Sequence, residues 1–118
     1  MIPKFRAYNP ATNDWYKPEE VFVSDGNIYL DDDDFYELIQ NNDVTLMQST
    51  GLFDKNGQEI FEGDVVRMHS GELLPVRLHH GMFEPVCYYV SSVFEKVGNI
   101  FENPELTEHP DFREATND

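Results

Sequence analysis

Cysteine and basic residues are the scarce components of this sequence. Cys87 is the only cysteine among 118 residues, so the chain cannot form an internal disulfide. Eight Lys and Arg stand against 23 Asp and Glu, a net charge of −15 that would repel nucleic acid and anionic membranes. No apolar run approaches the roughly 18 residues of a membrane-spanning helix, and the N-terminus turns polar too early for a signal peptide. We therefore expect a cytoplasmic protein that contacts neither nucleic acid nor membranes directly.

The composition is that of a folded protein. Hydrophobic residues make up 40% and aromatic residues 14% of the chain, which is too apolar for a disordered one. A length of 118 residues predicts a single domain around one hydrophobic core, and no linker or internal repeat interrupts it. The acidic surplus is compatible with basic partners, divalent cations or solubility alone, and solubility is the simplest of these explanations.

Short apolar segments separated by turn residues dominate the chain. Asp25-Gly26 is typical of a tight hairpin, and Asn56-Gly57 favours the two positive φ angles of a type I′ turn. Further turns are expected at Glu62-Gly63-Asp64 and at His80-Gly81. The strands expected between these turns cover residues 2–8, 21–23, 28–30, 44–48, 65–68, 74–79, 82–90 and 98–101. This pattern predicts a mainly β fold, a small barrel or sandwich.

One short helix and a polar tail are the exceptions to the strand pattern. The acidic run Asp31, Asp32, Asp33 and Asp34 precedes Phe35, Leu38 and Ile39, which are spaced i, i+3, i+4. This spacing predicts an amphipathic helix whose positive end is stabilised by the carboxylates. From Asn103 onward the chain is polar and contains two prolines, so we expect a loose tail.

No residue pattern indicates a metal or cofactor site. The acidic run lacks the alternating ligands, central glycine and terminal glutamate of an EF-hand loop. His79 and His80 are adjacent, and neighbouring side chains of a strand point to opposite faces, so the two should not chelate together. His69 and His109 have no zinc-ligand spacing with Cys87. We therefore expect no bound metal and no cofactor.

No catalytic residues are expected either. Cys87 lies in the apolar segment 84–90, predicted as a strand, where a cysteine usually packs as a small hydrophobic residue. His79 or His80 could face it across the hairpin, so a Cys/His pair stays open, but no nucleophile or oxyanion-hole motif accompanies it. The sequence also lacks a glycine-rich phosphate loop. These observations predict a protein that is not an enzyme.

Four segments of the chain together resemble a known family. They are residues 4–8, residues 46–48 together with 50–52, residues 54–66 (DKNGQEIFEGDVV) and residues 97–106 (VGNIFENPEL). Their order and spacing are similar to those of the YopX family, whose members are encoded by phages and prophages. Ser49 and the pair Tyr8-Asn9 depart from the family pattern. The resemblance covers most of the chain and suggests a YopX-like domain over residues 1–107 and a polar C-terminal tail over residues 108–118.

The resemblance implies a mainly β fold with an SH3-like barrel element and self-association, but no established activity. Gly51, Gly57, Gly63 and Gly98 fall in the matching segments, and we interpret them as sites where strands reverse. The expected function is that of a phage accessory protein that binds a host or phage protein. The alternatives are an acidic decoy of a nucleic-acid-binding protein and a virion structural component. Tyr88-Tyr89, expected to point to opposite faces, favours a homo-oligomer, because one ring would remain exposed or lie at an interface.

Overall fold

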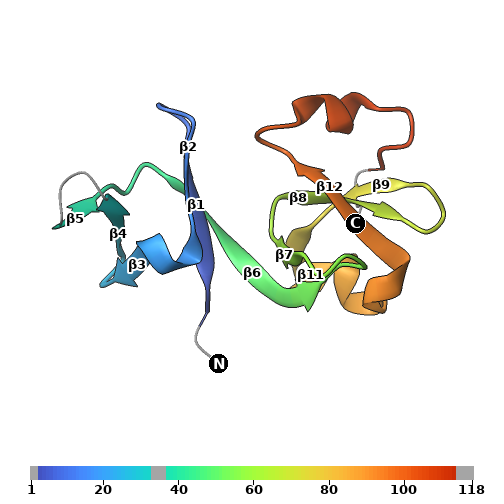
Figure 1. Cartoon of the computed structure of the whole chain (residues 1–118), viewed down its shortest axis with the longest axis horizontal. Coiled ribbons are helices and arrows are strands. Elements are labelled where there is room, and N and C mark those ends of the chain that lie inside the picture. The colour runs from blue at the N-terminus through green and yellow to red at the C-terminus, as the bar shows by residue number, and fades with distance from the viewer. Residues whose placement is uncertain (1–2, 33–36, 114–118) are drawn as a thin grey trace. The chain divides into compact units, whose positions relative to one another are not determined.

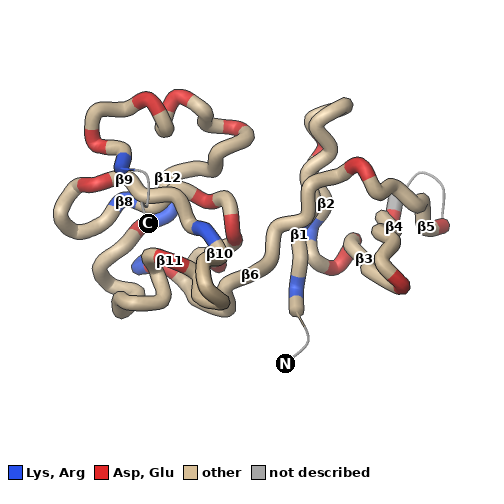
Figure 2. The backbone as a smooth tube through the Cα atoms, turned by 180° about the vertical axis from the view of Figure 1, so that it is seen from behind, with Lys and Arg blue, Asp and Glu red and all other residues tan. Residues whose placement is uncertain are grey.

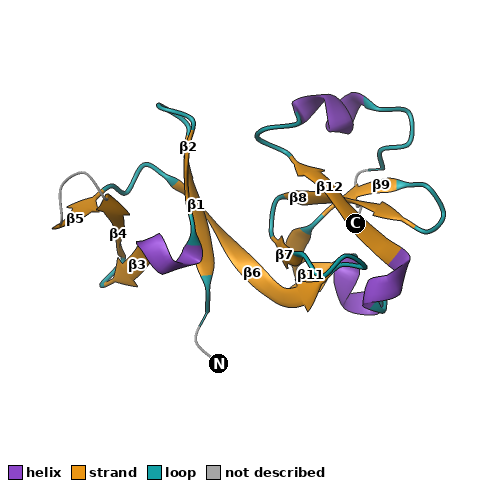
Figure 3. Cartoon of the chain, viewed as in Figure 1, coloured by secondary structure: helices purple, strands orange, loops and turns teal. Residues whose placement is uncertain are grey.

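The computed structural model describes residues 3–32 and 37–113, which belong to two compact units, Met1–Gln48 and Ser49–Asp118. Strands dominate both units, and the helices are short 3-10 turns, so the predicted mainly β class is confirmed (Figures 1 and 3). The SH3-like barrel element stays a prediction. The expectation of a single core is wrong, because two separate clusters of buried residues form. The boundary lies inside β6 (Thr45–Phe53), which carries no linker composition that would reveal it.

The first unit contains two groups of antiparallel strands. β1 (Phe5–Asn9) pairs with β2 (Asp14–Tyr16) and with the first half of β6. The 3-10 turn η1 (Pro18–Glu20) leads into the sheet β3-β4-β5, formed by Val21–Ser24, Asn27–Asp32 and Glu37–Gln40. The core cluster consists of Ala7, Leu30 and Val44, packed against Tyr16, Val21, Ile28 and Leu46.

The predicted hairpin at Asp25-Gly26 is confirmed. Asp25 and Gly26 have φ angles of 51° and 79°, the two positive values of a type I′ turn, and Ser24 is paired with Asn27. The predicted helix is wrong: Asp31 and Asp32 end β4, and residues 37–40 form β5. Pairing with β4 outweighs a helical spacing that spans too few residues to sustain a helix. Phe35, Asp33 and Asp34 lie outside the described residues.

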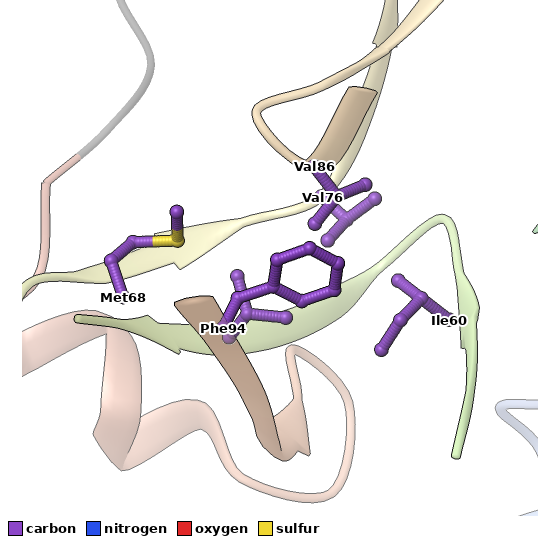
Figure 4. Packing of buried hydrophobic residues seen from close by; sticks show 6 residues of the cluster. Ile60, Met68, Val76, Val86 and Phe94 are labelled. Carbon is purple, nitrogen blue, oxygen red and sulfur yellow. The ribbon is translucent and has the colours of Figure 1, made fainter. Parts of the chain in front are cut away.

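The second unit is built on the antiparallel sheet β12-β8-β9, formed by Phe94–Asn99, Asp64–Met68 and Leu73–Pro75. β7 (Glu59–Phe61) pairs with the second half of β6. The core cluster surrounds Phe94, whose ring points into a group of aliphatic side chains (Figure 4). Its buried members are Ile60, Val66, Met68, Val76, Val86 and Phe94.

A hairpin of β10 (Arg77–His79) and β11 (Met82–Glu84) turns at His80-Gly81 as predicted. Its second arm was expected to reach residue 90, but the strand ends at Glu84. Pro85 follows and has no N–H for the ladder. The chain continues through the 3-10 turns η2 (Val86–Tyr88) and η3 (Ser91–Val93) into β12. The last expected strand, residues 98–101, is also displaced, because β12 ends at Asn99.

The expectation of a loose tail is wrong as far as Arg113. Residues 104–108 form the 3-10 turn η4 (Pro104–Glu108). Beyond it, the Leu73 N–H donates to the Asp111 carbonyl and the Arg113 N–H donates to the Leu73 carbonyl, both at 2.8 Å. These two bonds hold the segment against β9. The hydrophobic pattern of the sequence could not predict this pairing with Leu73, because backbone groups and not side chains make it.

Candidate functional site

Asp54 is a buried carboxylate at the start of the segment 54–66. Its side chain is 3% exposed and accepts the N–H groups of Asn56 and Gln58, each at 2.9 Å, and of Lys96 at 2.8 Å. Burial raises the pKa of Asp54. The three backbone N–H groups and the Lys96 ammonium together lower it by more than burial raises it, so the pKa lies below its usual value. The carboxylate therefore fixes the turn after β6 and ties it to β12.

The side chains of Asp64 and Asn99 also accept hydrogen bonds from backbone N–H groups. Asp64 is fully buried, accepts the Phe61 N–H at 2.8 Å and lies 3.4 Å from the Lys96 ammonium. The Asn99 side-chain oxygen accepts the N–H groups of Phe101 and Glu102 at 2.9 and 2.8 Å. The polar residues of the family-like segments thus satisfy backbone donors within the fold.

The glycines of these segments do not all lie at strand reversals. Gly57 and Gly63 lie in turns with positive φ. Gly51 also has a positive φ, of 77°, but lies inside β6 where its register with β7 shifts, and Gly98 lies inside β12. A Cβ at Gly98 would collide with Asn103 Oδ1 and lie 2.9 Å from a Leu106 methyl group. A side chain here would displace the Asn103 amide, whose oxygen accepts the Asn99 N–H at 3.2 Å.

The predicted type I′ turn at Asn56-Gly57 is wrong, because only Gly57 has a positive φ there. The Asp54 carboxylate accepts the Asn56 N–H, and the Gly57 N–H donates to the Asp54 carbonyl at 3.0 Å. The aspartate side chain therefore determines this turn.

The two neighbouring histidines lie together, contrary to expectation. The His79 and His80 rings are 4.0 Å apart between centroids, because His80 has left the strand and has a φ of 51° in the turn. His79 Nδ1 lies 3.3 Å from Glu84 Oε1 across the hairpin. In the described part of the chain, no group of three or more His, Cys, Asp or Glu residues could hold a metal ion.

Cys87 lies in η2 and not in the predicted strand. Burial and the nearby Glu84 carboxylate raise the pKa of the Cys87 thiol, which disfavours the thiolate that nucleophilic catalysis needs. The same carboxylate accepts a hydrogen bond from the Tyr88 hydroxyl at 2.8 Å, and this bond raises the pKa of Tyr88. Glu84 therefore contacts His79 and Tyr88 and disfavours ionisation of the thiol.

A run of exposed apolar side chains follows the hairpin of the second unit. Tyr88, Tyr89 and Val90 are 59%, 52% and 69% exposed, and the Tyr88 hydroxyl lies 4.0 Å from the sulfur of the exposed Met82. We call these four residues the 82–90 surface. Both tyrosines are more than half exposed, although the sequence predicted opposite orientations with only one exposed. The expected strand geometry is absent because Tyr88 ends a 3-10 turn.

A cleft of about 420 Å³ adjoins this surface at Tyr89. Its apolar lining comes from Met68, Leu74, Tyr89 and Val93, and its polar lining from His69, Ser70 and Glu72. A partly apolar depression beside exposed aromatic rings is typical of a site that receives side chains of a partner. The sequence pointed to the two tyrosines but gave no sign of the cleft, because its lining comes from segments distant in sequence.

A second groove, of about 440 Å³, lies in the first unit. Its lining comes from the start of the chain, from η1 and from β3, namely Pro3, Lys4, Phe5, Pro18, Val21, Phe22 and Val23. Sequence reasoning missed this groove. The uncharged run Val21-Phe22-Val23 is the signal that the sequence offers here, and by itself it predicts a strand and no groove.

The comparisons with known proteins agree with the resemblance. The family model described as YopX protein matches residues 4–108. Protein EF1440 from Enterococcus faecalis is similar in structure, with a TM-score of 0.65 and 26% identity over 90% of this chain and 98% of that one. Protein yopX from Bacillus subtilis has a TM-score of 0.62 and 15% identity over the same shares. No curated protein matches the sequence. Within the described residues, no helix is long and apolar enough to cross a membrane.

Proposed function

The chain belongs to the YopX protein family, and we propose that it acts by binding another protein and not by catalysing a reaction. The observation that carries this proposal is the 82–90 surface. Three consecutive apolar residues with more than half of their area exposed are costly to leave in water unless a partner covers them. Tyrosine and methionine are also enriched where proteins meet.

The chemistry of the titratable groups supports a role without catalysis. The carboxylates of Asp54 and Asp64 accept hydrogen bonds from backbone N–H groups of the fold. The pKa of Cys87 is raised, whereas a catalytic cysteine needs a lowered one. The His79 imidazole pairs with Glu84, and Glu84 accepts the Tyr88 hydroxyl with its other oxygen. These contacts suit a rigid binding surface.

An acidic decoy is the second candidate, and the net charge of −15 favours it. Acidic positions are spread along both units (Figure 2). A decoy would attract a basic protein that normally binds phosphates, and its complex would weaken steeply as salt is added. An interface centred on the 82–90 surface depends on apolar burial, so salt should change its affinity little.

The test compares pull-downs by the immobilised chain and by a variant of its apolar surface. Nuclease-treated bacterial lysate is passed over wild type and over the double variant Tyr89→Ser, Val90→Ser, at roughly 0.1 and 0.5 M salt. The matched control is Val97→Ser, which removes an exposed apolar side chain from β12. We expect a partner that survives high salt on wild type and on the control but is lost on the double variant.

Three outcomes would count against this assignment. Release of the partner by high salt, with no effect of the double variant, would favour the acidic decoy. Retention of the partner by both variants at high salt would place the interface elsewhere. Light scattering of the eluted chain tests self-association: a wild-type oligomer that the double variant converts to monomer would mean that the 82–90 surface joins copies of the chain.

A further inference from the structure

The edge strand β3 leaves backbone groups open. β3 is the outer strand of the sheet β3-β4-β5, and the type I′ turn makes Ser24 and Asn27 its closing hydrogen-bonded pair. Because antiparallel bonds alternate, Phe22 also faces β4, whereas Val21 and Val23 direct their N–H and C=O groups away from it. The opposite side of β4 agrees with this alternation, since the Ile28 N–H donates outward to Asn42 Oδ1 at 2.8 Å.

Val23 is the open position on this edge. The Val21 N–H is taken by the Pro18 carbonyl, which closes η1. Within residues 3–32 and 37–113, neither the N–H nor the C=O of Val23 has a hydrogen-bond partner. An exposed edge strand without a charged residue, a proline or a bulge is ready to pair with another strand.

The groove of the first unit is lined by this same strand. Val21, Phe22 and Val23 form one side of it, and Phe22 and Val23 are 45% and 47% exposed. Pro3, Phe5 and Pro18 supply further apolar lining, and Lys4 is the one charged residue that lines the groove. An extended peptide needs both features, since the edge supplies main-chain hydrogen bonds and the groove accepts alternate side chains.

Charge identifies the kind of peptide. Residues 1–48 contain ten acidic and three basic side chains. Acidic segments lie at both ends of β3 (Figure 2), where Glu19 and Glu20 precede the strand and Asp25 follows it. Lysine or arginine residues of a bound strand would be attracted there, whereas a second copy of a chain with a net charge of −15 would be repelled.

We propose that the edge of β3 and its groove bind an extended, basic segment of a partner protein, with apolar and basic residues in alternation, as an added antiparallel or parallel strand. The proposal rests on the proposed function, because the occupant is a protein. The proposed strand-binding site belongs to the first unit, whereas the 82–90 surface belongs to the second. A two-unit protein with one such contact in each unit would engage its partner at two places.

The probe for this site is the fluorescein-labelled peptide KVKVKVK, measured by fluorescence anisotropy against the full chain. Its controls are the block peptide KKKKVVV, which has the same composition, and the acidic peptide EVEVEVE. We expect saturable binding of the alternating basic peptide alone. Hydrogen exchange gives the signature of an added strand: the Val23 amide becomes protected at saturation, whereas the Phe22 amide, already bonded to β4, is unchanged.

Val23→Pro and Val23→Thr form a matched pair of variants. Proline removes an N–H that the pairing with β4 does not use, so an edge strand tolerates it. We expect Val23→Pro to weaken peptide binding about fivefold, the effect of one lost hydrogen bond, and Val23→Thr to leave it within about twofold.

Equal binding of the block peptide, unchanged exchange of the Val23 amide at saturation, or wild-type affinity of Val23→Pro would each overturn the proposal. The exchange measurement uses wild-type protein, so it decides the question even if the proline variant fails to fold. The double variant Tyr89→Ser, Val90→Ser should bind the probe like wild type. Probe binding by wild type without loss of the lysate partner on the double variant would mean that the 82–90 surface fails and this site does not. Loss of the lysate partner on the double variant without probe binding by wild type would mean the reverse.

Discussion

Replacing Asp54 with alanine removes the acceptor of three backbone N–H groups at once. The donors are Asn56, Gln58 and Lys96, at 2.8 to 2.9 Å from the carboxylate oxygens. An unsatisfied buried N–H costs about 1–3 kcal/mol. These donors are partly buried and water can reach them in the variant, so the lower figure applies to each. The free energy of unfolding should fall by about 3 kcal/mol, a large fraction of the 5–15 kcal/mol typical of a small protein.

Asp54→Asn separates the charge from the hydrogen bonds. The amide keeps one acceptor oxygen and turns an NH₂ group toward at least one backbone N–H, so we expect a loss of about 1–2 kcal/mol. The pKa of Asp54 is lowered in the folded protein, so its ionisation stabilises the fold above the unfolded value near 3.8. This contribution is lost as the pH falls through the folded pKa. The difference between wild type and Asp54→Asn should therefore shrink below about pH 4.

Urea unfolding followed by far-UV circular dichroism measures these differences. The single tryptophan, Trp15, lies in β2, so its fluorescence reports separately on the first unit. Asp43→Asn, at an exposed position, makes the same change of charge as a control and should alter stability by less than about 0.5 kcal/mol. An Asp54→Ala variant as stable as this control would refute the conclusion that the Asp54 carboxylate holds the turn after β6 against β12.

Three other substitutions or modifications test the packing and the chemistry of the second unit. Gly98→Ala places a methyl group against the Asn103 side chain and should lower the free energy of unfolding in urea by about 2 kcal/mol. An unchanged free energy of unfolding would mean that the Asn103 side chain moves aside without cost. Lys96→Met leaves the buried Asp64 carboxylate without its ammonium partner and should lower the free energy of unfolding by about 3 kcal/mol at neutral pH. An unchanged midpoint of urea unfolding would mean that this ion pair does not stabilise the fold. Because the pKa of Cys87 is raised, its thiol should react with iodoacetamide more slowly than N-acetylcysteine at pH 8, and its rate should rise only at higher pH. Alkylation faster than that of N-acetylcysteine would indicate a nucleophilic thiolate.

Local patterns predicted the hairpins well. Asp25-Gly26 and His80-Gly81 both have the positive φ angles that their turns require, and the strands on either side pair as expected. Turn chemistry acts over four residues, so a sequence contains all of its determinants. The YopX family membership was predictable for the same reason, since the family segments are short and contiguous.

Predictions failed where hydrogen bonding, and not the apolar pattern of a segment, decides the structure. Residues 37–40 are a strand because β4 offers them an edge, and the segment after Glu84 leaves the sheet because Pro85 has no N–H to continue it. The Asn56-Gly57 turn took another form because the Asp54 carboxylate binds its backbone. In each case, a hydrogen bond or its absence outweighed the propensity of the segment.

The amino-acid sequence by itself determined the mainly β class, the family and the acidic charge, since these depend on composition and on contiguous patterns. Only the tertiary structure decided where the second unit begins, which carboxylates are occupied by backbone donors, and which apolar side chains remain exposed. The 82–90 surface and the groove beside β3 belong to this second group. Exposure and an open strand edge depend on what lies beside a residue in space, and the periodicity of a single chain does not encode that neighbour.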